Sequence, residues 1–143
     1  MMFLFIRIEE YPLEIEYVKE ERTILGCRIV DIDYFMKRSM SLQLKHSKRC
    51  TSGYLQLIKE ERVGLQSRFI LKCNFCEKDL DIYNEEPSNE KSSTLNKAVV
   101  WGTLATGSTY SHTDKLFSVL NIPFISKYSF YKIQRELSTV KIS

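Results

Sequence analysis

The stretch from His46 to Cys76, HSKRCTSGYLQLIKEERVGLQSRFILKCNFC, decides the fold that the sequence predicts. It holds three of the four cysteines and one of the two histidines, and these residues lie at its two ends. Between the ends are two strand-like runs, YLQLIKEE and GLQSRFILK, which meet at a turn signal at Val63 and Gly64. The stretch is therefore predicted to form a β-hairpin.

Folding the hairpin about that turn brings its cysteines together. Residues equidistant from the turn face each other in an antiparallel pair, so Cys73 lies opposite about Tyr54 and Cys76 opposite about Thr51. Cys50 then arrives beside the C-terminal pair of cysteines. The hairpin is thus predicted to close a cluster of metal ligands.

His46 lies four residues before Cys50 and completes the donor set, with the spacing H-x3-C-x22-C-x2-C. Thiolate and imidazole donors in a tetrahedral array suit zinc, and four protein ligands leave no open position for a catalytic water. The predicted cofactor is one structural zinc ion, with the ligands His46, Cys50, Cys73 and Cys76.

Other interpretations of the cysteines stay open. Cys27, in the apolar run LGCRIV, is the rival of His46 for the fourth position, although a buried cysteine in a strand is normally a small hydrophobe. The hairpin cysteines could also be half-buried thiols, a disulfide or, in CNFC, a redox pair. A redox CxxC motif of the thioredoxin kind opens a helix after a strand, whereas a charged strand-like segment follows here.

The rest of the first half is predicted to be rich in strands. MMFLFIRIEE, LEIEYV, CRIVDI and KDLDIY have the composition or the alternation of strands. Asp33 is the expected N-cap of one helix through YFMKRSMSLQL, with Phe35, Leu42 and also Met36 facing inward.

A polar linker, NEEPSNEKSS at residues 84–93, is expected to lead into three short helices. The first is predicted to end at Gly107, and its inward face is Leu95, Ala98, Val99, Gly102 and Ala105. A capping box from Ser111 to Asp114 is predicted to open the second, with Leu116, Phe117 and Leu120 inward. The third is predicted to begin near Ser126 and to place Phe130, Ile133 and Leu137 on one face.

Composition and charge narrow the class of protein. The 143 residues fit one domain, or one domain with a small subdomain. The net charge of +3 is too small to establish nucleic-acid binding, and no apolar run approaches the ~20 residues of a membrane-spanning helix. The opening residues lack the features of a secretory signal. An intracellular chain with reduced cysteines is therefore expected, which favours a metal over a disulfide.

No other group of side chains forms a catalytic motif. His112 lies in the predicted capping box and is expected at the surface. Asp31 and Asp33 are two positions apart, without a third carboxylate or a histidine tied to them, so capping and solvation explain them better than catalysis. The sequence shows neither a Gly-rich phosphate loop nor a Ser–His–Asp grouping with motif support.

Two basic groups are candidates for contact with nucleic acid. Lys48 and Arg49, together with Lys45, surround two proposed ligands. They are either a solvated flank that keeps thiolates deprotonated, a phosphate contact or part of a nuclear localisation signal. Lys132 and Arg135 fall on the outer face of the last helix. The last two helices, joined by a short turn that contains proline, resemble a helix-turn-helix arrangement.

Several segments match one known family in its order. They are GCRIVDIDYF, a cysteine before a hairpin containing E..GL.S.F, LKCNFC, LNKAVVWGTLATGS and LNIPFISKYSFYK, and they run from Gly26 to Lys132. Taken together, RIVDI.YF, KC..C and LNIP..S...F are specific. The chain resembles the Mutator-like transposase domain carried by many arthropod proteins, although Cys27 stands where a basic residue is expected and the first twenty-odd residues do not match.

The resemblance implies a transposon-derived DNA-recombination protein. Its zinc-ligand pattern carries onto Cys50, Cys73 and Cys76 directly, and onto His46 less directly. Full-length members are similar to other cut-and-paste transposases in having a downstream RNase H-like region with metal-binding carboxylates. This chain is expected to be a partial copy without that catalytic region.

The predicted fold class is α+β, a zinc-stapled β-hairpin unit with a small cluster of three to four helices. Residues 1–86 are expected to form the β-rich zinc-binding subdomain, and residues 87–143 a helical subdomain resembling a helix-turn-helix. The predicted function is that of a nuclear, non-catalytic DNA-binding accessory domain. The alternative is a zinc-stabilised protein–protein interaction module. DNA is the expected partner, a homo-oligomer or a protein partner stays open, and no membrane association is expected.

Overall fold

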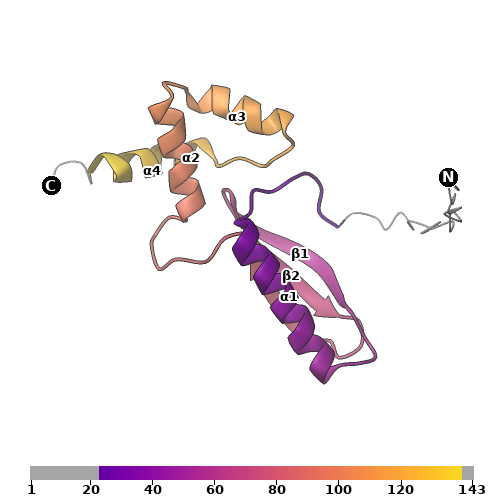
Figure 1. The fold of residues 1–143 in the computed structure, drawn as a ribbon. Helices are drawn as coiled ribbons and strands as arrows, with labels where there is room; N and C mark the ends of the chain where they lie inside the picture. Colours follow the sequence, from indigo (N-terminus) through magenta and orange to yellow (C-terminus); the bar gives the residue numbers. More distant parts are fainter. Residues whose placement is uncertain (1–22, 140–143) are drawn as a thin grey trace, which may run out of the picture.

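The computed structural model describes residues 23–139, which form four helices and a three-stranded antiparallel sheet (Figure 1). The elements follow in the order α1 (Ile32–Arg49), β1 (Leu55–Val63), β2 (Gln66–Cys73), β3 (Asp79–Tyr83), α2 (Thr94–Ala105), α3 (Tyr110–Val119) and α4 (Lys127–Thr139). The predicted α+β class is confirmed. The strands expected in MMFLFIRIEE and LEIEYV lie outside the described residues.

The predicted hairpin is confirmed, with a register about one residue away from the one expected. Leu55 pairs with Cys73, and the ladder shifts at an irregularity between Leu57 and Lys59. The turn lies one position later than predicted, between the paired residues Val63 and Gln66. The predicted KDLDIY strand is also confirmed, because β3 pairs with the other edge of β2 and gives the order β1-β2-β3.

Helix α1 lies along the sheet (Figure 1). Its Phe35 ring packs edge-on against Phe69 of β2. The helix begins two residues earlier than predicted, because Asp31, not Asp33, is the N-cap and accepts a hydrogen bond from the Tyr34 amide. It also continues to Arg49, beyond the predicted end, and so includes His46. The expectation for Met36 is wrong, since that side chain is 44% exposed.

The strand predicted in CRIVDI is wrong, because residues 27–30 have no regular secondary structure. This segment links the two halves instead. The Cys27 amide donates to the Asn121 carbonyl at 2.8 Å, and the Arg28 guanidinium holds the Glu60 carboxylate of β1 through two hydrogen bonds of 2.6 Å. Its backbone groups therefore bond to loops and side chains rather than to a neighbouring strand.

The hydrophobic core lies where the hairpin turn meets the three C-terminal helices. Its buried members are Leu65, Val100, Phe117, Ile125, Phe130 and Ile133. Gly64 has a φ of 64°, and a Cβ atom there would lie 2.4 Å from a methyl carbon of Ile125. Only glycine fits this close approach, which sets the hairpin turn against the helices.

The inward faces of the C-terminal helices agree only partly with the prediction. Helix α4 begins next to Ser126 and buries Phe130 and Ile133, as predicted. On helix α2, Leu95 and Val99 of the predicted face are partly buried and pack against the core, while the fully buried residues are Asn96, Val100 and Thr103. Ala98 and Ala105 of the predicted face are exposed.

Helix α3 also begins and packs differently from the prediction. Thr109, not Ser111, is the N-cap of α3, and its side chain accepts from the His112 amide. Phe117 is buried, as predicted, but Leu116 and Leu120 are more than half exposed. The expected capping box and two of the three expected core residues are therefore wrong.

Two asparagine side chains satisfy the backbone of the hairpin near its turn. The Asn96 amide group bonds to the Leu65 N–H at 2.8 Å and to the Val63 carbonyl at 2.9 Å. Asn84 is fully buried, although the sequence places it in the polar linker, and it bonds to Leu65 and Ser67. These amides replace the strand neighbours that the end of the hairpin lacks.

Candidate metal centre

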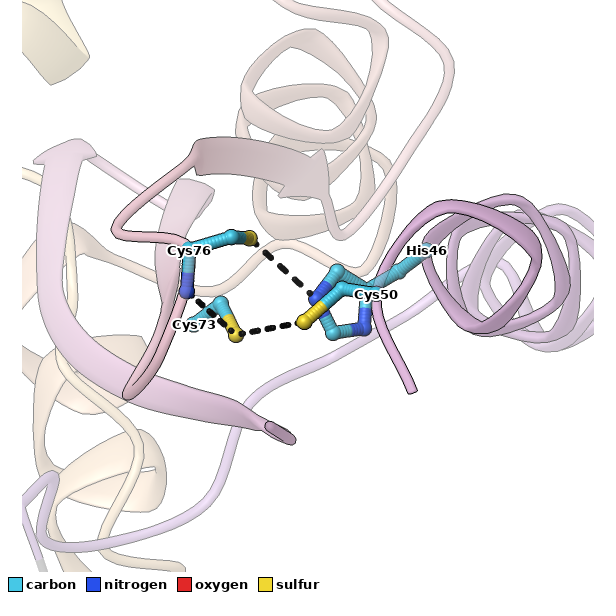
Figure 2. Close-up of side chains that lie close together, drawn as sticks. All are labelled: His46, Cys50, Cys73 and Cys76. Atoms are coloured by element: carbon cyan, nitrogen blue, oxygen red, sulfur yellow. Dashed lines mark hydrogen bonds between the residues drawn. The ribbon is translucent and has the colours of Figure 1, made fainter. Parts of the chain in front are cut away.

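Four potential metal donors meet at the end of the hairpin away from α2, α3 and α4 (Figures 1 and 2). His46 lies in the last turn of α1, and Cys50 is the C-cap of that helix. Cys73 is the last residue of β2, and Cys76 lies in the turn that leads to β3. The donor atoms of all four residues lie within 4.8 Å of one another.

The side chains form two close pairs (Figure 2). The Sγ atoms of Cys50 and Cys73 are 3.8 Å apart, and the Sγ atom of Cys76 lies 3.6 Å from Nε2 of His46. His46, Cys50 and Cys73 are buried, whereas Cys76 is exposed. The cluster is therefore shielded on most sides and open to solvent at Cys76.

The turn after β2 wraps around the Cys73 sulfur. This Sγ atom accepts hydrogen bonds from the amides of Phe75 and Cys76, each at 3.4 Å. Glu77 adopts a left-handed φ of 55°, and the Lys78 carbonyl then accepts from the Cys73 amide at 3.3 Å. The chain turns back within a few residues, which places two sulfurs on the same side.

Gly53 makes room for the cluster on the side of β1. A Cβ atom at this position would lie 2.5 Å from the Cys73 sulfur and 2.6 Å from the Cβ atom of Phe75. Because real Cβ atoms do not approach so closely, any larger residue would displace the turn that carries Cys73 and Cys76. The segment after Cys50 thus passes directly over the sulfur atoms.

The surroundings of the thiols favour one thiolate in the cluster even without a metal. Burial raises the pKa of Cys73, but hydrogen bonds from the amides of Cys76 and Phe75, then from the Cys76 and His46 side chains, lower the pKa to about 6. For Cys76, the Lys78 amide lowers the pKa, yet burial and the neighbouring thiols outweigh this and leave the pKa raised. The first proton therefore leaves Cys73, and metal ligation requires the others to leave too.

The rival ligand Cys27 does not join this group. Cys27 is exposed, and its amide bonds to Asn121 in the loop before α4, far along the molecule from the cluster. Within residues 23–139, the donor group consists of the four predicted residues. His112 is exposed on α3, and Asp31 and Asp33 have structural partners at the start of α1.

The predicted basic residues lie in two separate places. Lys48 and Arg49 are exposed in the last turn of α1, beside the cluster. Lys132 and Arg135 are exposed on α4, on the side opposite the buried Phe130 and Ile133. The structure does not bring the two groups together, because α1 ends at the far end of the hairpin from α4 (Figure 1).

A hollow of about 380 Å³ adjoins the cluster. Three of the donors line it together with the apolar Leu42 and Leu80, and its cationic side chains are Lys45, Arg49 and Lys78. Lys78 is a cation of this hollow that the sequence patterns did not single out. The lysine two positions after the CxxC motif was the available signal, but its orientation depends on the turn through Glu77.

Fold and donor set together define a small α+β domain with a cluster of three thiols and one imidazole that could hold a metal ion. The chain belongs to the Mutator-like transposase family, whose model matches residues 26–142. Comparison with curated proteins and with solved structures found no match. None of the helices within residues 23–139 has the length and apolar character needed to cross a bilayer.

Proposed function

We propose that His46, Cys50, Cys73 and Cys76 bind one structural zinc ion. In a regular tetrahedron with Zn–S of about 2.3 Å and Zn–N of about 2.0–2.1 Å, the S···S edge is about 3.8 Å and the S···N edge about 3.6 Å. The Cys50–Cys73 separation of 3.8 Å and the Cys76–His46 separation of 3.6 Å fit these edges. They are two of the six edges of the tetrahedron, and all four donor atoms lie within 4.8 Å of one another. The convergence of three sulfurs and one imidazole nitrogen is the observation that carries the zinc proposal.

The proposed zinc would take the place of a hydrophobic core at this end of the sheet. The buried hydrophobic cluster lies at the opposite end, around the hairpin turn. Metal ligation would hold the last turn of α1, the start of β1 and the turn after β2 in one arrangement. With four protein donors there is no open position for substrate, so the ion would be structural.

We also propose that the chain is a DNA-binding accessory part of a transposase and acts in the nucleus. Membership of the family supports a role on DNA. The proposed contacts are Lys48, Arg49, Lys132 and Arg135, which are all exposed. Among the described residues none of the four forms an ion pair, whereas Arg28, Lys37, Lys59, Arg68 and Lys97 all do. Their charges therefore stay available for phosphate.

In this proposal the two ends of the molecule have different roles. Residues 1–86 would form the zinc-binding part and residues 87–143 the helical part, with phosphate contacts at each. Leu65 joins the hydrophobic core of the helical part, so the hairpin turn would fix the spacing between the two contact sites. In this proposal the chain itself carries no catalytic carboxylates.

The DNA proposal is tested by the salt dependence of duplex binding, measured by fluorescence anisotropy with the zinc-loaded chain. Neutralising Lys48, Arg49, Lys132 or Arg135 to glutamine should weaken binding for all sequences and reduce the salt slope by about one. Lys37→Gln is the matched control, because Lys37 lies on the same helix as Lys48 but pairs with Asp33 at 2.9 Å. A zinc-loaded chain that binds no duplex at low salt would refute the proposal.

An apolar groove favours a second candidate function, a zinc-stabilised protein interaction module. The groove has a volume of about 340 Å³ and lies between α1 and the sheet, with walls that include Phe35, Leu55, Leu57 and Phe69. β1 is an edge strand of the sheet, and Met40 of α1 is 62% exposed. Binding through this groove would change little with salt, in contrast to binding through lysine and arginine.

A further inference from the structure

The hollow of about 380 Å³ beside the donor cluster opens the cluster to solvent. His46, Cys50 and Cys76 line it, whereas Cys73 does not line it and is only 1% exposed. Cys76 is the exposed donor of the four. A molecule that approaches the donors from solvent would therefore meet Cys76 first and Cys73 last.

Apart from the donors, every ionisable side chain that lines this hollow is a cation. Lys45 and Arg49 lie one helical turn apart on α1, and Lys78 directly precedes β3. Among the residues that the structure describes, none of the three forms an ion pair. Glu77 and Asp79 flank Lys78 in the sequence but do not line the hollow. The positive charge is therefore free to attract an anion.

These cations reverse the sign of the charge that the zinc-loaded site would present to solvent. A zinc ion with three thiolates and a neutral imidazole carries a net charge of about −1, which repels anions. The three cations bring the net charge around the hollow to about +2. Clefts lined by charge of one sign concentrate ligands of the opposite sign and speed their association.

The size and lining of the hollow suit a small molecule. Its volume of about 380 Å³ lies within the range of small-ligand pockets, ~300–1,000 Å³, and Leu42 and Leu80 give it apolar surface. Guanidinium and ammonium groups bind carboxylates through charge-assisted hydrogen bonds. A ligand with several carboxylates would be held by the cations while other donor atoms of the same ligand reach the metal.

We propose that the hollow binds small polycarboxylate metal ligands, and that Lys45, Arg49 and Lys78 hold such a ligand beside the donors while the metal is exchanged. This inference rests on the proposed zinc site and adds the route and the class of molecule through which that site gains or loses its metal. The exchange leaves the oxidation state of the ion unchanged, and the cysteines that lose the metal take up protons from water as the pH requires.

The test compares two chelators on the full zinc-loaded chain, the polycarboxylate EDTA and the uncharged pyridyl chelator TPEN. Native mass spectrometry follows the zinc-loaded fraction with time. Release to EDTA should speed up in proportion to EDTA concentration and slow as ammonium acetate is added, because salt screens the attraction. Lys45→Gln, Arg49→Gln and Lys78→Gln should each slow this release by about 3-fold, and the triple variant by roughly 30-fold. Release to TPEN should change less than about two-fold.

Two control variants separate the charge of the hollow from other effects. Lys78→Arg keeps the charge and should keep the rate of the parent. Lys72→Gln removes a charge next to Cys73 but outside the hollow, because Leu71 faces the groove beside α1 and Lys72 therefore faces the other side of the sheet. It should release zinc to EDTA at the rate of the parent.

Slower release to EDTA alone cannot come from weakened ligation, since a variant that binds the metal less tightly would release it faster to both chelators. Equal rates with EDTA for the triple variant and the parent would overturn the exchange route and leave the zinc proposal intact. Release from the parent at a rate independent of EDTA concentration would do the same. A purified chain that neither holds nor takes up zinc would overturn both proposals.

Discussion

The imidazole Nε2 of His46 lies 3.6 Å from the sulfur of Cys76, although the two residues are 30 positions apart in the sequence. The contact joins the last turn of α1 to the turn between β2 and β3. Since Cys50 and Cys73 form a second close pair beside it, removing any one of the four side chains would leave an incomplete donor set.

The first prediction concerns the donor set. Cys73→Ser should lose the metal, because it removes the buried sulfur around which the turn is built. Cys27→Ser is the matched control and should retain one zinc per chain, since Cys27 is exposed and bonds to Asn121 through its backbone alone. The measurement is the metal content of the purified variants. Loss of metal in Cys27→Ser together with retention in His46→Ala would assign the site to the four cysteines.

The second prediction concerns removal of the metal. Chelation should open the end of the hairpin that carries the donor cluster, because ligation supplies folding free energy there and the hydrophobic core lies at the other end. Hydrogen exchange followed by mass spectrometry should show loss of protection in residues 45–54 and 72–79, while the buried parts of α2 and α4 stay protected. Equal loss of protection in both halves would show that the proposed subdomains do not unfold separately.

The third prediction concerns Asn84. Its side chain makes hydrogen bonds of 2.7–2.8 Å to the Ile29 carbonyl, the Leu65 carbonyl and the Ser67 amide. Asn84→Ala leaves these buried groups without partners and should lower the free energy of unfolding by about 3 kcal/mol. Asn89→Ala, in the exposed part of the same linker, should change it by less than about 0.5 kcal/mol. Urea denaturation of both variants checks the difference.

The fourth prediction concerns pH. Hydrogen bonds from Arg28 lower the pKa of Glu60, burial opposes this, and a hydrogen bond from Ser67 lowers the pKa further. The pKa of this carboxyl is therefore lower in the folded chain than in the unfolded chain, where it is near 4.3. Such a carboxylate stabilises the fold fully at pH values above the unfolded pKa, and the stabilisation is lost as the pH falls through the folded pKa. Glu60→Gln should therefore be less stable than the parent at pH 7.

The difference in unfolding free energy between Glu60→Gln and the parent should shrink as the solution becomes acidic below about pH 4.3. Denaturant titrations of both chains from pH 7 to pH 3 measure it. Glu61→Gln is the matched control, because Glu61 lies next to Glu60 but its ion pairs with Lys59 and Arg68 are exposed to solvent. A difference that stays constant across this range would contradict the assigned role of the Arg28–Glu60 pair.

The fifth prediction is that the chain alone neither cleaves nor joins DNA in magnesium or manganese. Such chemistry uses metal ions held by carboxylates, and Asp31 and Asp33 are engaged otherwise. Asp31 caps α1 through the Tyr34 amide, and Asp33 pairs with Lys37. Gel assays with a labelled duplex check this, and nicking that disappears in Asp31→Ala or Asp33→Ala would refute it.

Local patterns predicted the elements whose boundaries depend on nearby residues. The hairpin followed from its turn signal and strand-like runs, and α4 followed from the spacing of its apolar residues. The four donors could be found because a hairpin brings equidistant positions together, and an error of one residue in register does not separate them.

The predictions that failed concern residues whose positions depend on contacts between distant parts of the chain. CRIVDI has strand-like composition, yet its hydrogen bonds go to the Asn121 loop and to the side chains of Glu60 and Asn84 instead of a strand ladder. The buried face of α2 includes Asn96 beside the predicted Leu95 and Val99, because the Asn96 side chain bonds to the hairpin turn. Asn84 looks like a linker residue, and only the crossing of three segments buries it.

The sequence by itself determined the α+β class, the hairpin and the three hairpin cysteines with His46 as the leading fourth donor, since each depends on spacing along the chain. Only the tertiary structure decided that Cys27 lies away from the cluster, that Lys78 joins Lys45 and Arg49 around one hollow, and that Asn84 is buried. The physical reason is that side-chain direction and burial depend on packing between segments far apart in the sequence. Hydrophobic periodicity reports only which side of one element is apolar.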